Sequence, residues 1–203
     1  MSGEETVAVY QVRSDGEIAL ARLAADGIDA RLAVDDEGGL NPGFFSLYGV
    51  RLIVRPEDVE VAHQSLGIEH VAVPAQVADA MFKHAGWAYP EEACGLVAFD
   101  HVGKPVMTMC LSNEDRAVDR FTISPAEHFG AIGLSERCGN SIGAVFHSHP
   151  RSEAYPSEAD IGGGADPDWL HFIVGPVAGA RPLLRAYRIT DGEVAEVKIT
   201  IGQ

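Results

Sequence analysis

The chain has 203 residues, 46% hydrophobic residues and a formal net charge of −15, which suits a globular protein of one large or two small domains. An acidic surface without a basic stripe repels phosphate backbones, so we expect no nucleic-acid partner. No apolar run reaches the roughly 18–20 residues that cross a bilayer, and the acidic start MSGEET does not resemble a signal peptide. We therefore expect a cytoplasmic protein without membrane association.

The first part of the chain, residues 1–67, predicts a small α+β domain with the order β-α-β-β-α. A turn signal, Asp15-Gly16, separates the first strand from the first helix, and Gly67 ends the last helix. His63 is isolated on that helix and is expected to be a surface or packing residue. The predicted segments are strands 6–12, 28–34 and 47–54, helices 17–25 and 55–66, and a glycine-rich loop 35–45.

The second part, residues 68–203, predicts a larger domain that contains both helices and strands. Gly86 is expected to stop the first helix, whereas Ser124, Pro125 and Glu127 have the chemistry of a capped helix start. A turn at residues 190–192 predicts a closing hairpin. The predicted segments are strands 71–73, 94–99, 105–111, 120–123, 141–146, 169–174, 183–189 and 194–199, and helices 74–85 and 124–137.

Three well-separated cysteines, Cys94, Cys110 and Cys138, form no C-x-x-C pair. The spacing therefore indicates neither a zinc ribbon nor a redox pair. Reduced, buried thiols are the expected state of all three, as is usual in a reducing compartment.

Residues 146–160, which read FHSHPRSEAYPSEAD, carry the strongest chemical signal. His147 and His149 are two positions apart, so on an extended chain their imidazoles point the same way. Ser157 has the features of a helix cap, and the turn that follows can return Asp160 toward the histidines. The glycines at 162–164 predict that this helix is short. Two imidazoles and one carboxylate are the ligand count of a catalytic zinc site with an open fourth position.

The pattern H-S-H-P, six residues, S, two residues, D resembles the signature of JAMM (MPN+) zinc metallopeptidases, and the segment PEEACG at 90–95 resembles that family's glutamate motif. The resemblance implies a cytidine-deaminase-like α+β domain, with a central mixed sheet flanked by helices. It also implies one zinc ion per chain, held by His147, His149 and Asp160. Glu92, rather than its neighbour Glu91, matches the general base, and Ser157 matches the donor to the oxyanion.

Within that family the chain is similar to compact bacterial members that release cysteine from a sulfur-carrier protein. The similarity lies in residues 113–116, 153–157, 184–189 and 191–192. It implies a zinc-dependent metallopeptidase that hydrolyses the C-terminal peptide or isopeptide bond of a ubiquitin-like or sulfur-carrier protein. The carrier tail is then the partner. The N-terminal domain resembles a prokaryotic signal-transducing module, for which we expect docking or homo-oligomerisation.

Other interpretations remain open for each residue. The His-x-His pair could bind nothing, Asp160 could merely complete a capping box for Ser157, and Glu92 could be an exposed turn acid. The whole chain would then be a non-catalytic MPN-type scaffold with an accessory docking domain. The remaining histidines of this part have no matching partner and are expected to be structural or exposed: His84, His101, His128 and His171. The H-E-x-x-H and P-C-x-x-C motifs of other zinc hydrolases are absent from the sequence.

Overall fold

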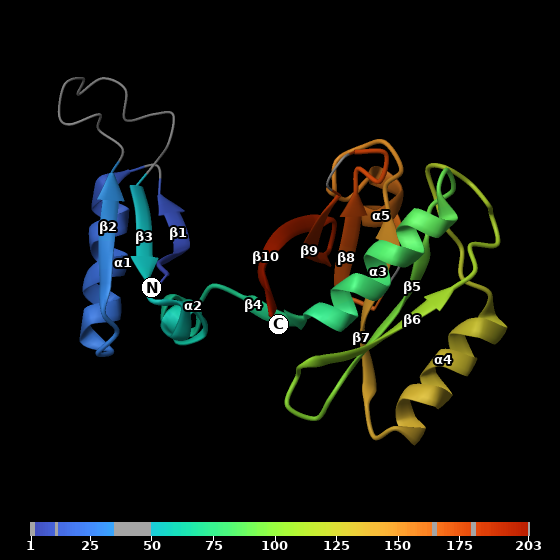
Figure 1. Ribbon diagram of the computed structural model, residues 1–203, viewed down its shortest axis with the longest axis horizontal. Coiled ribbons are helices and arrows are strands. Elements are labelled where there is room, and N and C mark those ends of the chain that lie inside the picture. The colour runs from blue at the N-terminus through green and yellow to red at the C-terminus, as the bar shows by residue number, and fades with distance from the viewer. Residues whose placement is uncertain (1–2, 11, 35–49, 164–165, 180–181, 203) are drawn as a thin grey trace. The chain divides into compact units, whose positions relative to one another are not determined.

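A computed structural model describes residues 3–10, 12–34, 50–163, 166–179 and 182–202 of the chain (Figure 1). The chain divides into two compact units, Met1–His70 and Val71–Gln203. The predicted loop 35–45 and the start of the strand predicted at 47–54 lie outside the described residues. Among the helices that the structure describes, none is long and apolar enough to span a membrane.

The first unit is a three-stranded antiparallel sheet with two helices, and its element order is the predicted β-α-β-β-α. The sheet has the order β1-β3-β2, and its core joins residues of β1, β3 and both helices. The elements are β1 (Glu5–Tyr10), α1 (Arg13–Ala25), β2 (Ala30–Val34), β3 (Val50–Val54), a 3₁₀ turn η1 (Pro56–Asp58) and α2 (Val59–Leu66).

The predicted turn at Asp15-Gly16 is wrong, because both residues lie inside α1, which starts at Arg13. Gly16 is buried, and a β-carbon at this position would lie 3.2 Å from Val50 and 3.3 Å from Leu32. The glycine therefore permits close approach of the helix to the sheet, rather than a chain reversal. His63 is a packing residue, since it is buried and its Nε2 lies 3.0 Å from the Val7 carbonyl oxygen.

The second unit is a seven-stranded sheet with the order β4-β10-β9-β8-β7-β5-β6. Strands β7 and β8 are parallel, whereas the pairs β10–β9, β9–β8, β7–β5 and β5–β6 are antiparallel, so the sheet is mixed as predicted. The elements are β4 (His70–Pro74), α3 (Ala75–Ala88), β5 (Cys94–Phe99), β6 (Pro105–Leu111), α4 (Pro125–Arg137), β7 (Ser141–Ser148), α5 (Glu158–Gly162), β8 (Leu170–Gly175), β9 (Leu183–Thr190) and β10 (Glu193–Gly202).

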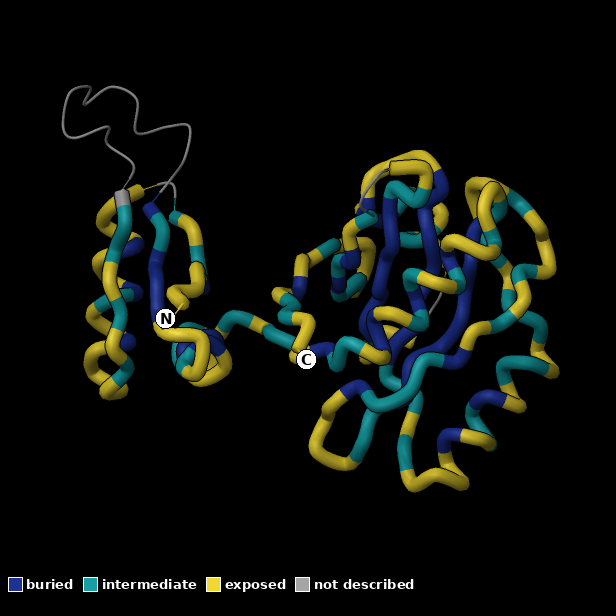
Figure 2. Tube along the Cα trace, viewed as in Figure 1, coloured by how far each residue is buried: buried dark blue, intermediate teal, exposed yellow. Residues whose placement is uncertain are grey.

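Two apolar cores form on the sheet because side chains alternate along its strands. On β7, Phe146 packs in the core that contains the buried face of α3, whereas Val145 packs with Ala131 of α4. The strands between the helices are the most buried part of this unit (Figure 2). His147 lies two residues after Val145 on the same strand. Its side chain therefore points to the same face of the sheet, the side covered by α4.

One predicted helix end and one predicted strand are wrong. Gly86 does not stop α3, which continues to Ala88 and ends because a residue that precedes proline, here Tyr89, is pushed into extended conformation. The predicted strand 120–123 is irregular, since its backbone pairs with a side chain: Thr122 N–H donates to Asn113 Oδ1.

Two predicted side-chain roles in this unit also need correction. Ser124 caps α4 as expected, but the carboxylate of Glu127 accepts from Ser112 N–H and Oγ instead of closing a capping box. Cys94 is buried as predicted, whereas Cys110 and Cys138 are exposed, because they lie on an outer strand and at a helix end. All three cysteines are free thiols.

Candidate metal centre

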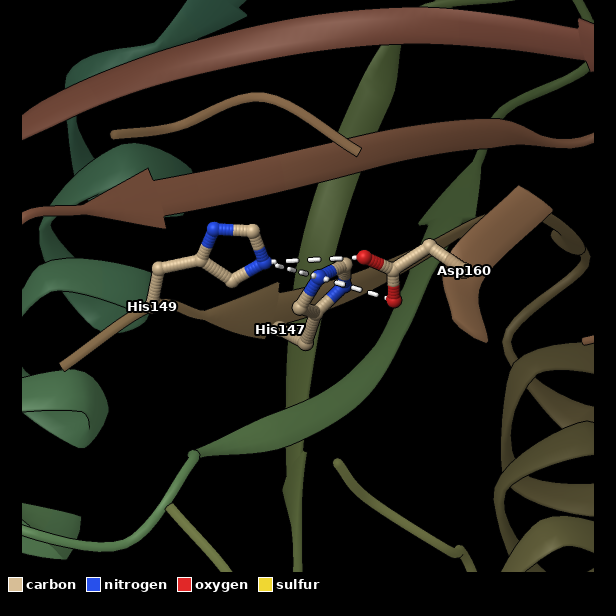
Figure 3. Close-up of side chains that lie close together, drawn as sticks. All are labelled: His147, His149 and Asp160. Atoms are coloured by element: carbon tan, nitrogen blue, oxygen red, sulfur yellow. Dashed lines mark hydrogen bonds and ion pairs between the residues drawn. The ribbon is translucent and has the colours of Figure 1, made fainter. Parts of the chain in front are cut away.

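The end of β7 and the short helix α5 bring three side chains together (Figure 3). His147 Nε2 lies 3.1 Å from His149 Nε2 and 3.2 Å from Asp160 Oδ1. His149 Nε2 lies 3.5 Å from Asp160 Oδ2. These are the residues that the sequence predicted as ligands. The side chains of all three are almost fully buried.

This geometry fits a zinc ion. Tetrahedral ligands at about 2.0–2.1 Å from zinc lie about 3.3–3.4 Å from one another, close to the three separations above. His149 Nδ1–H donates to the Glu153 carbonyl oxygen at 2.7 Å, because a carbonyl only accepts. The neutral ring then has its lone pair on Nε2, directed at His147 and Asp160. Two ring nitrogens and a carboxylate that lie this close together are a ligand set suited to a divalent cation.

Asp160 is oriented by its own helix cap. Ser157 N–H and Ser157 Oγ–H both donate to Asp160 Oδ2 at 2.7 Å, and Asp160 N–H donates back to Ser157 Oγ at 3.2 Å. Burial opposes ionisation of Asp160, but its close contacts with His147 and His149 and the hydrogen bonds from Ser157 outweigh burial and hold its pKa well below the usual range. The capping box and the ligand role are therefore compatible, and the box presents an ionised carboxylate to the histidines.

His147 is held differently from His149. It is fully buried, and burial lowers its pKa against the opposing effect of Asp160, so the ring is neutral as a metal ligand must be. Phe121 stacks on its ring, with centroids 4.9 Å apart and an interplanar angle of 23°. Within the described part of the chain, His147 Nδ1 has no hydrogen-bond partner. Stacking on the ring face, rather than a hydrogen bond to Nδ1, therefore fixes the orientation of this candidate ligand.

Glu92 is buried, with 5% exposure, so it is not an exposed turn acid. The adjoining Ala93 is fixed to the histidine motif, because its N–H donates to Ser148 Oγ at 2.9 Å and its carbonyl accepts from Ser148 N–H at 3.0 Å. Burial raises the Glu92 pKa to about 7, against the opposing effect of His149 and with a smaller contribution from Asp160. A carboxyl group whose pKa lies near neutrality, and which interacts electrostatically with two candidate ligands, suits proton transfer.

A cavity of about 340 Å³ opens beside Asp160 on the α4 side of the sheet. His171, which was expected to be structural or exposed, lies on its wall with 6% exposure, and burial lowers its pKa to about 4. The parallel pairing of β7 with β8 places His171 opposite Val145, a relation that no local pattern reveals. His84 is structural, since its Nε2 lies 3.0 Å from the Leu111 carbonyl oxygen, and His101 is exposed. The lining also includes Arg120, Phe121, His128 and Trp169.

Comparison with known proteins places this chain in a family. Residues 74–190 match the family described as prokaryotic homologs of the JAB domain, and this range includes all five predicted site residues. The chain belongs to this JAB family. The predicted JAMM/MPN resemblance and fold class are thereby confirmed.

Individual JAB relatives are moderately similar. The CysO-cysteine peptidase of Mycobacterium tuberculosis H37Rv is 29% identical over 132 residues, which cover 64% of this chain and 90% of that protein. The desampylase of Haloferax volcanii is 25% identical over 137 residues, which cover 64% of this chain and 96% of that protein. A Desulfitobacterium hafniense protein of known solution structure has a TM-score of 0.60 at 26% identity, covering 66% of this chain and 93% of that one.

Proposed function

We propose that this chain is a zinc-dependent peptidase that hydrolyses the peptide or isopeptide bond at the C-terminal end of a ubiquitin-like or sulfur-carrier protein. The observation that supports it most is that His147, His149 and Asp160 approach the spacing of zinc ligands. Glu92 is buried, and its neighbour Ala93 bonds to Ser148, between the two histidines. The names of two JAB relatives, a CysO-cysteine peptidase and a desampylase, support this class of substrate. Release of cysteine from a carrier–cysteine adduct is the specific reaction that we propose to test first.

One zinc ion per chain would be held by His147, His149 and Asp160. Zinc supplies Lewis acidity, which makes a water molecule nucleophilic near pH 7 and polarises a carbonyl group. Glu92 accepts the proton of the attacking water and passes it to the departing amine. Its position in a buried site and its pKa of about 7 suit both halves of that transfer.

Ser157 is proposed as the donor to the oxyanion. Its hydroxyl has one proton, which is donated to Asp160 Oδ2 in this structure. The hydroxyl must therefore rotate toward the oxyanion during the reaction. Ser157 N–H also donates to Asp160 Oδ2 at 2.7 Å, so the carboxylate keeps one partner while the hydroxyl turns. Such a donor contributes about 3 kcal/mol in other enzymes.

The proposed partner is an extended carrier tail that enters the site from solvent, and we place the reaction in the cytoplasm. Three free thiols in the described chain agree with a reducing compartment. The unit Met1–His70 is proposed to dock or dimerise.

The decisive experiment compares Glu92→Gln with its matched control, Glu91→Gln, in the zinc-loaded full chain. The proteins are incubated with carrier–amino acid conjugates and the products are weighed by mass spectrometry. Loss of the base should lower turnover by about 10²–10⁴-fold while zinc is retained, whereas the control should remain active. Full turnover by Glu92→Gln would show that the assigned base is wrong. A wild type that binds zinc and the carriers but cleaves none would support the scaffold alternative.

A further inference from the structure

The side chain of Asn113 lies at the centre of the loop that follows β6, and its amide group uses its full hydrogen-bonding capacity. Nδ2 donates to the carbonyl oxygens of Glu92, at 3.1 Å, and Arg120, at 3.0 Å. Oδ1 accepts from the N–H groups of Asp115, at 3.1 Å, and Thr122, at 3.2 Å. An amide offers two donor hydrogens and two acceptor lone pairs, so no capacity remains. A reversed amide would face two carbonyls with its oxygen, so the network fixes its orientation.

Three of these four bonds hold two parts of the candidate site that lie outside both β7 and α5. One bond holds the peptide of Glu92, the proposed base. Two others hold the carbonyl of Arg120 and the N–H of Thr122, the residues on either side of Phe121, whose ring stacks on His147. The amide of Asn113 therefore fixes the backbone of Glu92 relative to Phe121, the residue whose ring stacks on His147.

The backbone N–H of Glu92 is also hydrogen-bonded to this loop. Glu92 N–H donates to the Ala117 carbonyl oxygen at 2.8 Å, and Ala117 lies in the loop 113–122 that the Asn113 side chain closes. At the start of this loop, the Asn113 carbonyl oxygen accepts from Arg116 N–H at 3.2 Å. Release of the amide would therefore loosen both backbone anchors of Glu92, although Ala93 would stay bonded to Ser148.

We propose that Asn113 is a positioning residue for the hydrolysis, one that holds Glu92 at its working distance from the metal ligands. The inference rests on the proposed function. Asn113 touches none of the three ligand side chains in the described contacts, so it acts through Glu92 and Phe121.

The test uses Asn113→Asp, Asn113→Ala and a control in the same loop. Aspartate keeps the shape but sets a carboxylate oxygen against the carbonyls of Glu92 and Arg120, while alanine removes all four bonds. The control, Thr122→Val, deletes only the 2.8 Å hydrogen bond from the Thr122 hydroxyl to Asp115 and leaves the Thr122 N–H on Asn113. If one Asn113 variant does not fold, the other provides the test.

In the zinc-saturated full chain, both Asn113 variants should lower kcat by about 10–100-fold with KM close to wild type, and they should weaken zinc binding by no more than loss of the Phe121 stack does. Thr122→Val should keep kcat within about twofold, because the Glu92 anchor is intact. Wild-type kcat in the Asn113 variants would overturn the proposal. An equal loss in Thr122→Val would also overturn it, because loop order alone would then explain the effect.

A second readout does not need turnover. Carbon-13 NMR of the metal-free full chain follows the Glu92 carboxyl group, whose pKa lies near 7 in the intact site. In the Asn113 variants the freed carboxylate should become more solvated, and its pKa should fall toward 4.5, the ordinary value. An unmoved titration would contradict the positioning role. If the wild type cleaves no carrier conjugate, the proposed function fails, yet this titration still decides whether Asn113 positions Glu92.

Discussion

The two histidines of the proposed zinc site are oriented by different means, although only one residue separates them. His149 is fixed by the hydrogen bond from its Nδ1–H to the Glu153 carbonyl oxygen, the usual arrangement behind a metal ligand. His147 has no such hydrogen bond among the described contacts, and the ring of Phe121 stacks on its face instead. The residue that orients His147 therefore lies far along the sequence, in a loop.

This difference predicts that Phe121→Leu weakens zinc binding. Aromatic stacking contributes about 0.5–1.5 kcal/mol beyond burial, so we expect an affinity about 3–10-fold lower than wild type. The same substitution at Phe129, which is 74% exposed on α4, is the control and should leave the affinity unchanged. Competition with a chromogenic chelator measures both. An unchanged affinity in Phe121→Leu would mean that the stack does not orient His147.

The buried Glu92 predicts an unusual pH dependence of stability in the metal-free chain. Its folded pKa of about 7 exceeds its ordinary value of 4.5. The contribution of protonated Glu92 to the free energy of unfolding is therefore fully present below pH 4.5 and is lost as the pH rises through 7. Relative to wild type, Glu92→Gln should gain about 1–3 kcal/mol in free energy of unfolding across this window, since one pKa unit corresponds to about 1.4 kcal/mol. Urea unfolding at several pH values measures the difference. A difference that is flat with pH would contradict the buried, protonatable carboxyl group.

At the scale of elements, α5 is the weakest part of the site. It has five residues, whereas isolated helices shorter than about 12–15 residues are marginal in water. Ser157 caps it, and Gly163 follows its last residue. Its order therefore depends on the capping box and on the contacts of Asp160 with the histidines.

We expect zinc to slow amide hydrogen exchange in α5 of the full chain, because a bound ion ties Asp160 to β7. Exchange in α4, which carries no ligand, should not change and serves as the internal control. In Asp160→Asn the zinc effect on α5 should disappear. Equal exchange in α5 with and without zinc would mean that Asp160 is not a ligand.

Most elements of the second unit could be predicted because their signals are local. The strand before the histidines, the Ser124 cap and the turn at Asp191-Gly192 each depend on neighbouring residues, and each is confirmed. The errors occur where tertiary contacts override a local signal. Gly16 was predicted to form a turn, but it lies in a helix and permits close packing against the sheet. The segment 120–123 was predicted to be a strand, but its Thr122 N–H bonds to the side chain of Asn113.

At the scale of the whole molecule, the same distinction applies to the site. The spacing of His147, His149 and Asp160 predicted the cluster that the structure shows, since one strand end and one helix turn carry it. Neither Phe121 nor His171 could be predicted, because their approach depends on the path of a loop and on the pairing of β7 with β8. Long-range contacts of this kind leave no periodic trace in a sequence.

The JAB family match begins at residue 74, so the proposed chemistry belongs to the unit Val71–Gln203. The docking or dimerisation role of the unit Met1–His70 remains a prediction. Analytical ultracentrifugation of the full chain, which measures its oligomeric state, would test dimerisation independently of catalysis.

X-ray absorption at the zinc edge of the full-length protein, combined with metal analysis, tests the central claim most directly. We predict one zinc per chain, with two imidazole nitrogens and oxygen ligands at about 2.0–2.1 Å, and no bound zinc in Asp160→Asn. Sulfur scattering at about 2.3 Å, or full zinc occupancy in Asp160→Asn, would contradict a centre built from His147, His149 and Asp160.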